Sequence, residues 1–414
     1  MRVKYISFAV CFLSLLLLAG SASSAGAIPA EQWNRTFGNI EYDCGNSVRQ
    51  TQDGGYILAG ETVVNYDEAN ADALLMKLNP DGIEEWSRTF GGPAYDCAYS
   101  VQQTADGGYV LAGYLEKGEE IDSRDPDSRD PDAWLIKTDS NGTEEWNFTF
   151  GGNKTDLIFS VEKAIDGGYL LAGYTESFGA GASDAWLIKT DSNGTEQWNK
   201  TFGGINEDYA SSVNQSKDGG YVISGFTNSS AGENEAWLIK TDSNGTEEWN
   251  KTFGGESYDY AYSVQELEDG GYILAGTTES FGTGRTDGWM IKTDSNGTEQ
   301  WNKTFGGPYT DNFYSVRKTT DKGFLLAGIT QPSSDYNNTQ AWLMKTDSEG
   351  QKEWEMNFGG QDDDSAAFAQ ETREGEYILA GRTSSYGMVS DVWLIKVGSD
   401  KNMTAELDNT TVGF

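Results

Sequence analysis

The sequence predicts an all-β protein, a seven-bladed β-propeller of four-stranded antiparallel blades that is closed by the N-terminal strand joining the last blade. One observation is a repeat, and its W-x-x-x-F-G blocks begin at Trp33, Trp86, Trp146, Trp198, Trp249, Trp301 and Trp354. A second is that each interval contains four short segments with strand patterns. The third is that the chain begins with a segment of the fourth kind and ends with one of the third kind, so its two ends can complete one blade.

Two further blocks recur in step with the tryptophan block. The first is DGGYILAG at 53–60, with variants at 106, 166, 218, 269, 321 and 374, and the second is DAWLIKT at 132 and 184, with variants at 72, 235, 287, 340 and 391. A helical solenoid is excluded, because 51 glycines and period-two patterning do not suit stacked helices.

The second repeat illustrates the four expected strands. The first lies around residues 100–104, and the turn Asp106-Gly107-Gly108 supplies the positive φ that a tight hairpin requires. The second and third strands, 109–114 and 133–138, are apolar on both faces, so each needs neighbours on both sides of the sheet. An Asn-Gly turn precedes the fourth strand, in which Trp146, Phe148 and Phe150 share one face.

Ring closure follows from the strand order. Residues 31–37 read as a fourth strand and residues 392–397 as a third strand, so the two should pair in the seventh blade. Closure leaves no partial blade with an unpaired edge. We therefore expect one propeller domain over residues 28–398, followed by a polar tail at 399–414.

The pattern accounts for all 13 tryptophans. Seven open the fourth strands and six lie in third strands, at Trp134, Trp186, Trp237, Trp289, Trp342 and Trp393. We expect them to pack between blades rather than stack on sugars, because burying an indole contributes on the order of 2–3 kcal/mol.

The run KTDSNGTEEW at 137–146, repeated nearly verbatim from 189, 240 and 292, resembles the tryptophan-docking motif of quinoprotein-type propellers. In that family an Asp, a Gly and a Trp hold adjacent blades together. The interval from the Asp to the Trp is one residue longer there than in this sequence, and the ring usually has eight blades. The resemblance implies the architecture, and because no quinone or metal site is recognisable it says nothing in favour of dehydrogenase activity. Residues 31–397 are also similar to secreted repeat proteins of bacteria and archaea that carry the DGGYILAG signature, including cell-surface proteins of methanogenic archaea, some of them named for polysaccharide degradation.

Composition restricts the possible chemistry. The 414 residues include no histidine, which excludes Ser-His-Asp and Cys-His catalysis and His-ligated metals. A formal charge of −36 argues against nucleic acid and anionic membrane surfaces as partners. We expect a monomer whose partners are cations, glycans, other cell-surface components or basic proteins, unless the acidity serves solubility alone.

Residues 1–27 have the pattern of a signal peptide. Arg2 and Lys4 precede an apolar run at 6–18, and Ala25-Gly26-Ala27 forms an A-x-A cleavage site. The run is too short for a membrane span, and no second apolar segment follows. We expect a mature protein that is secreted or held at the cell surface, without a membrane span.

An aspartate recurs five residues before the Val or Ala of every first strand, at Asp43, Asp96, Asp156, Asp208, Asp259, Asp311 and Asp364. These carboxylates either cap backbone amides in their own loops or converge on the mouth of the channel and hold Ca²⁺, which takes oxygen ligands. No other cofactor is expected.

N-x-[ST] sequons form a further repeated signal, and the glycosylation candidates are Asn34, Asn141, Asn147, Asn193, Asn199, Asn244, Asn250, Asn296 and Asn302. Those on fourth strands face away from the Trp side, towards the circumference. We expect a glycan belt there that keeps outer edges from pairing with other molecules. The Asn-Gly sequons also suit an ordinary hairpin turn.

Two features admit two interpretations each. Cys44 and Cys97 occupy equivalent positions in consecutive repeats, which favours a disulfide in an exported protein, yet equivalent positions of neighbouring blades can be too far apart to bridge. The acidic segment 116–132, which lengthens the second repeat, is either an inert solvated loop or a contact for a cation or partner.

These observations favour a non-catalytic extracellular propeller that serves as a binding or structural module. The alternatives are a glycan-binding propeller and a carbohydrate enzyme that works with carboxylates, which requires two Asp or Glu about 5–10 Å apart beside a groove. A catalytic site should also break the sevenfold repetition. The sequence singles out no catalytic residue.

Overall fold

The computed structural model describes residues 28–38, 41–65, 70–117, 130–228, 233–335, 338–387 and 389–400. The predicted signal peptide, most of the acidic segment at 116–132 and residues 401–414 of the predicted tail lie outside these ranges. Within them, no helix has the length and hydrophobicity that crossing a membrane requires.

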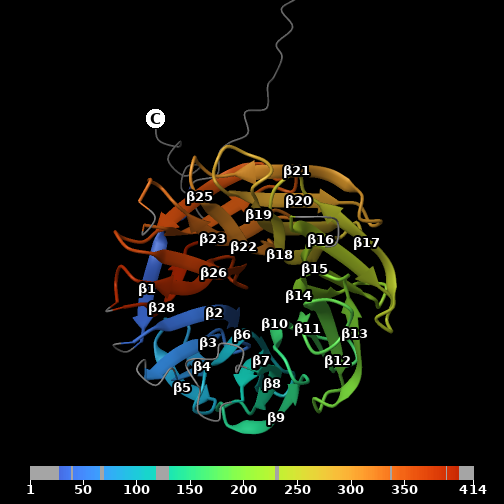
Figure 1. Ribbon diagram of the computed structural model, residues 1–414. Helices are drawn as coiled ribbons and strands as arrows, with labels where there is room; N and C mark the ends of the chain where they lie inside the picture. Colours follow the sequence, from blue (N-terminus) through green and yellow to red (C-terminus); the bar gives the residue numbers. More distant parts are fainter. Residues whose placement is uncertain are drawn as a thin grey trace, which may run out of the picture.

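The described strands form seven four-stranded antiparallel sheets arranged as blades around a central axis (Figure 1). The predicted seven-bladed propeller is therefore confirmed. The first strand of each blade lies nearest the axis and the fourth lies at the rim, as β14 and β17 show on one side of the ring (Figure 1).

Blade 1 consists of β2 (Asp43–Gln50), β3 (Tyr56–Asn65), β4 (Asn70–Leu78) and β5 (Glu84–Phe90), and blade 2 of β6 (Asp96–Gln103), β7 (Tyr109–Glu116), β8 (Pro131–Thr138) and β9 (Glu144–Phe150). Blade 3 consists of β10 (Asp156–Lys163), β11 (Tyr169–Thr175), β12 (Asp184–Thr190) and β13 (Glu196–Phe202). Blade 4 consists of β14 (Asp208–Gln215), β15 (Tyr221–Thr227), β16 (Glu235–Thr241) and β17 (Glu247–Phe253).

Blade 5 consists of β18 (Asp259–Glu266), β19 (Tyr272–Thr278), β20 (Asp287–Thr293) and β21 (Glu299–Phe305). Blade 6 consists of β22 (Asp311–Lys318), β23 (Phe324–Thr330), β24 (Gln340–Thr346) and β25 (Lys352–Phe358). Blade 7 consists of β26 (Asp364–Glu371), β27 (Tyr377–Thr383), β28 (Asp391–Val397) and β1 (Glu31–Phe37).

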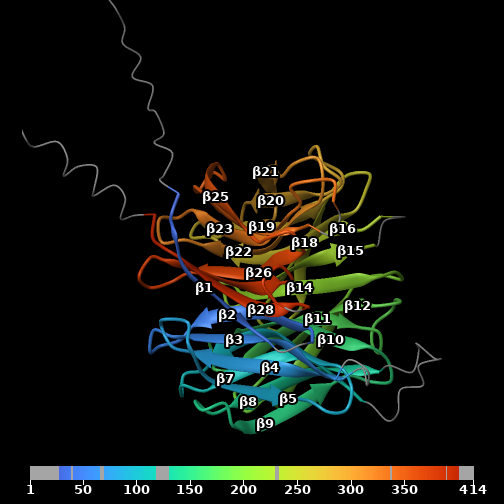
Figure 2. The ribbon, with the colours of Figure 1, turned by 90° about the vertical axis from the view of Figure 1, so that its left-hand side faces the viewer.

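The two ends of the described chain close the ring in blade 7. Strand β1 pairs antiparallel with β28, from Glu31 opposite Val397 to Phe37 opposite Val392. Figure 2 shows β1 in blue beside the red strands of that blade. The predicted pairing of residues 31–37 with 392–397 is therefore confirmed.

The first strands are longer than predicted. In the second repeat the strand begins at Asp96 rather than near residue 100, so the recurrent aspartate is its first residue. The hairpin turn that follows has the predicted backbone, since Gly107 has a φ of 86°. In blade 6 the equivalent position is Lys322, which adopts a φ of 74° without being glycine.

The tryptophan of each fourth strand packs against the next blade. In the contact between blades 1 and 2, a Cβ on Gly142 would lie 2.6 Å from the indole of Trp86, and Gly142 has a φ of 77°. Only glycine suits both constraints. Trp86 also contacts Tyr109, with 5.9 Å between ring centroids. Six turn glycines have this relation to the tryptophan of the preceding blade, namely Gly82, Gly142, Gly194, Gly245, Gly297 and Gly350.

The seventh contact between blades uses the end of the chain instead of a turn. The indole N–H of Trp354 in blade 6 donates a hydrogen bond to Asp400, at 3.0 Å. Asp400 belongs to the predicted polar tail, so the first residues of that segment dock on the propeller.

We predict that Trp198→Ala destabilises the protein by about 3 kcal/mol, because large-to-small changes at packed aromatic sites leave a cavity. Gly245→Val should also destabilise it, since the Cβ would lie 2.6 Å from the Trp198 ring. Equilibrium unfolding in urea measures both effects. The control is Ile165→Ala, where the side chain is 81% exposed. A Trp198→Ala effect no larger than that of the control would contradict this account of the contact.

Candidate functional site

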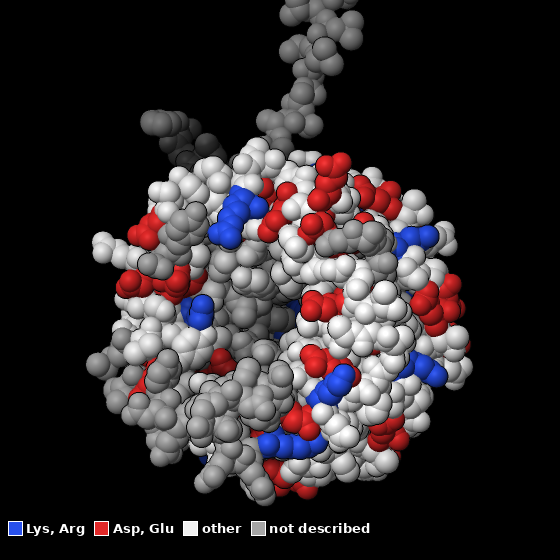
Figure 3. Space-filling model, in the orientation of Figure 1, with Lys and Arg blue, Asp and Glu red and all other residues white. Residues whose placement is uncertain are grey.

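The centre of the ring encloses a cavity of about 420 Å³. It is visible as the central hollow in Figure 3. Its wall is built almost entirely by the seven first strands, each of which contributes the same two consecutive positions. Four further lining residues, Arg49, Tyr209, Phe226 and Arg317, break this regularity.

A β-bulge in every first strand turns one residue towards this cavity. In β6 the register shifts between Ala98 and Ser100, so Tyr99 is left out of the ladder with β7. The same shift occurs in the other six blades. Bulges redirect side chains and are common beside functional sites. The seven bulged residues all line the cavity, and they are Asn46, Tyr99, Phe159, Ser211, Tyr262, Tyr314 and Ala367.

The residue after each bulge also lines the cavity. It is serine in six blades, at Ser47, Ser100, Ser160, Ser212, Ser263 and Ser315. Blade 7 departs from this rule, because Phe368 takes the place of serine. At this position after the bulge, the sevenfold repetition is therefore broken in one blade.

Two arginines surround this exceptional phenylalanine. The guanidinium carbons of Arg49 and Arg317 lie 4.0 and 4.6 Å from the centre of the Phe368 ring. They come from blades 1 and 6, which flank blade 7 on either side. Arg49 also approaches Glu162 of blade 3, with 4.0 Å between nitrogen and oxygen.

The electrostatics of this group follow from its burial. Burial lowers the pKa of both guanidinium groups. The charge of Arg317 lowers the pKa of Arg49 further, whereas Glu162 raises it. Both arginines remain cations at neutral pH, so two positive charges share one ring and are offset by one carboxylate.

Aromatic rings form a continuous series of contacts through blades 2 to 6, and most of these rings line the cavity. The series begins with Tyr99 and Phe159, whose centroids lie 5.3 Å apart, and ends with Tyr262 and Tyr314, at 5.7 Å. Between them the contacts pass through Tyr174, Tyr209, Phe226 and Tyr260. The cavity thus offers ring faces on one side and the arginine pair with Phe368 on the other.

The seven predicted aspartates lie elsewhere. Each is at most 2% exposed, and none lines the central cavity. Asp156 accepts hydrogen bonds from the amide of Gly152, at 2.8 Å, and from the hydroxyls of Ser177 and Thr175. The equivalent glycine amide caps the aspartate in five further blades, at Asp96, Asp208, Asp259, Asp311 and Asp364. The capping interpretation therefore describes the contacts of these six aspartates, and a Ca²⁺ site stays a prediction.

Some of these aspartates face a second carboxylate across a glycine. A Cβ on Gly91 would lie 2.4 Å from Asp96 and 2.7 Å from Asp72. Burial raises the pKa of Asp96 to about 6 against the lowering effect of two backbone amides, and Asp72 raises it further. A group of three acidic ligands is found, among the described residues, only at Asp321, Glu353 and Asp400.

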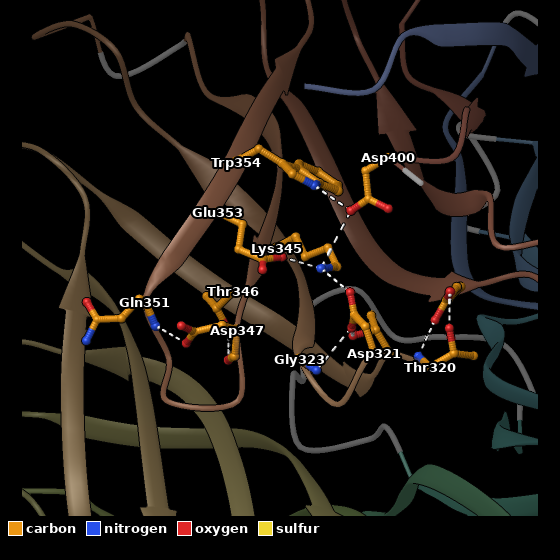
Figure 4. A network of polar contacts seen from close by, with 12 residues as sticks. Thr320, Asp321, Gly323, Lys345, Thr346, Asp347, Gln351, Glu353, Trp354 and Asp400 are labelled. Carbon is orange, nitrogen blue, oxygen red and sulfur yellow. Dashed lines mark hydrogen bonds and ion pairs between the residues drawn. The ribbon is translucent and has the colours of Figure 1, made fainter. Parts of the chain in front are cut away.

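That acidic group already encloses a cation, the ammonium group of Lys345 (Figure 4). The nitrogen lies 2.6 Å from Asp321 and 3.5 Å from Asp400, and it also pairs with Glu353. Other blades have a buried third-strand lysine paired with the aspartate of the hairpin turn, as in Lys77 with Asp53, Lys137 with Asp106, Lys189 with Asp166 and Lys240 with Asp218. The lysine pairs with the hairpin aspartates connect strands within one blade, whereas the pair of Lys345 with Asp400 connects blade 6 to the segment that follows β28 of blade 7. These ion pairs stabilise the fold.

The fourth-strand sequons combine exposure with a structural contact. Asn147 is exposed, and its side-chain oxygen accepts a hydrogen bond from the indole N–H of Trp134, at 3.3 Å. The same bond joins Trp186 to Asn199, Trp237 to Asn250 and Trp289 to Asn302. The amide nitrogen, to which a glycan attaches, donates a second hydrogen bond to the glutamate three residues earlier, as from Asn147 to Glu144. Glycosylation stays a prediction.

Cys44 and Cys97, the cysteines in the described part of the chain, are free thiols. The amide of Asn46 lies between them, since it accepts a hydrogen bond from Cys44 at 3.3 Å and donates one to Cys97 at 3.4 Å. Burial raises the pKa of Cys44 to about 12. Of the two interpretations offered by the sequence, the structure shows the unbridged one.

Comparison with known proteins adds the fold but no family. No family model matches the chain, and no curated protein matches it. Similar solved structures include a protein of unknown function from Dyadobacter fermentans DSM 18053, 13% identical with a TM-score of 0.50 over 89% of this chain and 98% of that one. Sqt1 from Chaetomium thermophilum is 11% identical, with a TM-score of 0.48 over 86% of this chain and 83% of that one. A puromycin hydrolase is 12% identical, with a TM-score of 0.43 over 86% of this chain and 52% of that one.

Sequence reasoning missed the cavity residues, although a signal for them was present. Within the first strands, the Val that follows the recurrent Ser is nearly constant, whereas the bulged position varies between five residue types. A position that varies while the rest of the repeat stays constant is one where the fold does not require a particular residue. The arginines and Phe368 are departures of the same kind.

We predict that Lys345→Met destabilises the protein by about 2 kcal/mol at pH 7, because it leaves partly buried carboxylates without their cation. Although burial opposes it, hydrogen bonding to Lys345 and Thr319 lowers the pKa of Asp321 to about 2. The stabilisation is therefore complete above pH 4 and is lost as the pH falls towards 2.

Urea unfolding at several pH values measures the difference between wild type and Lys345→Met, which should shrink between pH 4 and 2. The matched control is Lys352→Met, which breaks an exposed pair with Glu355 and should cost less than about 0.5 kcal/mol. Equal losses of unfolding free energy in the two variants would show that the buried ion pairs of Lys345 stabilise the protein no more than the exposed pair of Lys352.

Proposed function

We propose that this protein is a non-catalytic binding propeller that works outside the cytoplasm, and that its ligand site is the central cavity. The observation that carries the proposal is the bulged position of the first strands. Seven bulges turn seven residues into the cavity, and these residues differ between blades while the surrounding repeat is preserved. A scaffold that served only as a structure would not require this variation in its channel.

The composition of the wall favours binding over hydrolysis. No Asp or Glu is among the described residues that line the cavity. The neighbouring carboxylate, Glu162, faces Arg49. Hydrolysis of a glycosidic bond generally requires two carboxyl groups beside the substrate. Aromatic faces and hydroxyl groups are suited instead to holding a small polar molecule.

The remaining proposals concern the setting of the protein. The signal-peptide pattern of residues 1–27, the exposed rim sequons and the resemblance to DGGYILAG repeat proteins support a secreted or cell-surface glycoprotein. Contacts between Trp and Gly of adjacent blades agree with the resemblance to quinoprotein-type propellers. Glycans, other surface components and basic proteins are the proposed partners of this acidic chain. Ca²⁺ is the proposed cation for the paired aspartates.

We predict that filling the cavity abolishes ligand binding without unfolding the protein. Ser211→Trp and Ala367→Trp replace two small bulged residues and should remove affinity for any saccharide that the wild type binds. The control is Ile205→Trp, at a side chain that is 81% exposed. Calorimetric titration with a panel of neutral and acidic saccharides measures the binding, and chromatography of the mixtures detects cleavage.

Three results would count against the proposed function. They are the absence of binding across the panel, binding that survives both filling substitutions in folded protein, and cleavage of a polysaccharide that the filled variants no longer perform.

A further inference from the structure

The cavity carries a positive charge inside a strongly acidic protein. The chain has a formal charge of −36, yet the charged residues on the described cavity wall are two arginines, Arg49 and Arg317. Glu162 approaches Arg49 and offsets one of them. The centre of the ring therefore has an excess of one positive charge, which suits a ligand with one negative charge.

The arginines have hydrogen-bonding capacity left for such a ligand. In the described contacts, Arg49 donates one hydrogen bond to the carbonyl of Val48, at 3.2 Å, and Arg317 donates one to that of Val316, at 3.4 Å. A guanidinium group carries five N–H donors, and its planar arrangement matches the two oxygens of a carboxylate. Phe368 holds both groups beside the same ring, which places their donors at one side of the cavity.

The departures from the repeat at this place belong together. Phe368 replaces the serine that the other six blades have, and the arginines that contact it belong to the two adjacent blades. Two buried like charges raise the energy of the empty site. A bound anion would lower this energy. The two arginines therefore destabilise the empty cavity and favour the binding of an anion.

A hydroxyl group beside the arginines points to a polar ligand. Ser315 lies two residues before Arg317 and is 3% exposed, and its hydroxyl oxygen has no hydrogen-bond partner among the described residues. It lines the cavity together with the phenols of Tyr262 and Tyr314. A buried hydroxyl without a partner is costly, and rotation of the Ser315 side chain towards a hydroxylated ligand in the cavity would satisfy it.

We propose that the central cavity binds a sugar acid, a pyranose-sized ring with one carboxylate. The carboxylate is held by Arg49 and Arg317, the ring packs against the aromatic bulged residues, and its hydroxyls bond to the serine and tyrosine hydroxyls. The volume of about 420 Å³ suits a ligand of this size. The inference rests on the proposed function, since it names the ligand class of the same cavity.

Alternative ligands fit these observations less well. A neutral sugar leaves the repulsion between the arginines unrelieved. A phosphate dianion reverses the excess charge instead of cancelling it. A simple carboxylate such as acetate reaches the arginines and leaves the aromatic faces and the Ser315 hydroxyl unused.

Calorimetric titration of the folded protein with sodium glucuronate, glucose and sodium acetate tests the inference without any substitution. We expect glucuronate to bind with a dissociation constant below about 1 mM. Glucose and acetate should each bind at least about tenfold more weakly, because each lacks one of the two kinds of contact.

Arg49→Gln and Arg317→Gln should each weaken glucuronate binding about tenfold or more. The matched control is Arg35→Gln, at an exposed arginine on β1 that contacts Trp33 at the rim, and it should leave the affinity unchanged. Circular dichroism melting curves confirm that each variant is folded.

The outcomes separate this inference from the proposed function. If glucose binds as well as glucuronate and the cavity-filling substitutions abolish both, the binding function stands and the sugar-acid class is wrong. If acetate binds as well as glucuronate, the site recognises an anion and no sugar, which also overturns the inference. Failure of glucuronate to bind, or binding that both arginine variants retain, overturns it directly.

Discussion

The contact between the fourth-strand tryptophan of one blade and the turn glycine of the next is the interaction on which the ring depends. A blade does not complete a hydrophobic core by itself. Each of the seven core clusters combines residues of two adjacent blades. The core is therefore a series of interfaces, and removing any one of them opens the circle. The turn must be glycine because the indole occupies the space of a Cβ.

Closure gives the molecule a centre, and the centre is where the chain departs from its own repeat. The rim and the hairpin turns are nearly the same in every blade, whereas the bulged residues of the inner strands are not. The bulges allow this variation without a cost in pairing, since the residue left out of the ladder can change while its neighbours keep their partners. Within one inner strand, the positions that pair with the next strand are therefore separate from the bulged position that lines the cavity.

The sequence was sufficient for the architecture because its signals are local. The Asp-Gly-Gly turns, the doubly apolar second and third strands and the placement of Trp33 and Trp393 at opposite ends of the chain indicate both blade and closure. The bulges could not be predicted in this way, since a bulge is a relation between two strands. Arg49 and Arg317 are far apart in sequence, and only closure of the ring brings both to Phe368.

For the predicted sites too, the sequence identified the residues but not the contacts that they make in the folded chain. The aspartate series was evident from the sequence, but whether a carboxylate caps an amide or meets a metal depends on donors that the loop conformation brings to it. Asp156 accepts hydrogen bonds from Gly152, in the loop that connects blade 2 to blade 3, and from Ser177 of its own blade. The same limit applied to Cys44 and Cys97, because nothing in their spacing placed the Asn46 amide between the two sulfur atoms.

Ring closure is tested most directly by comparing the chain starting at residue 28 with one starting at residue 39, which lacks β1 and Trp33. We expect the shorter chain to unfold at a markedly lower urea concentration, and a peptide of residues 28–38 added in excess to restore much of the lost stability. A shorter chain that unfolds at the same urea concentration as the longer one, with no response to the peptide, would contradict ring closure as the source of stability.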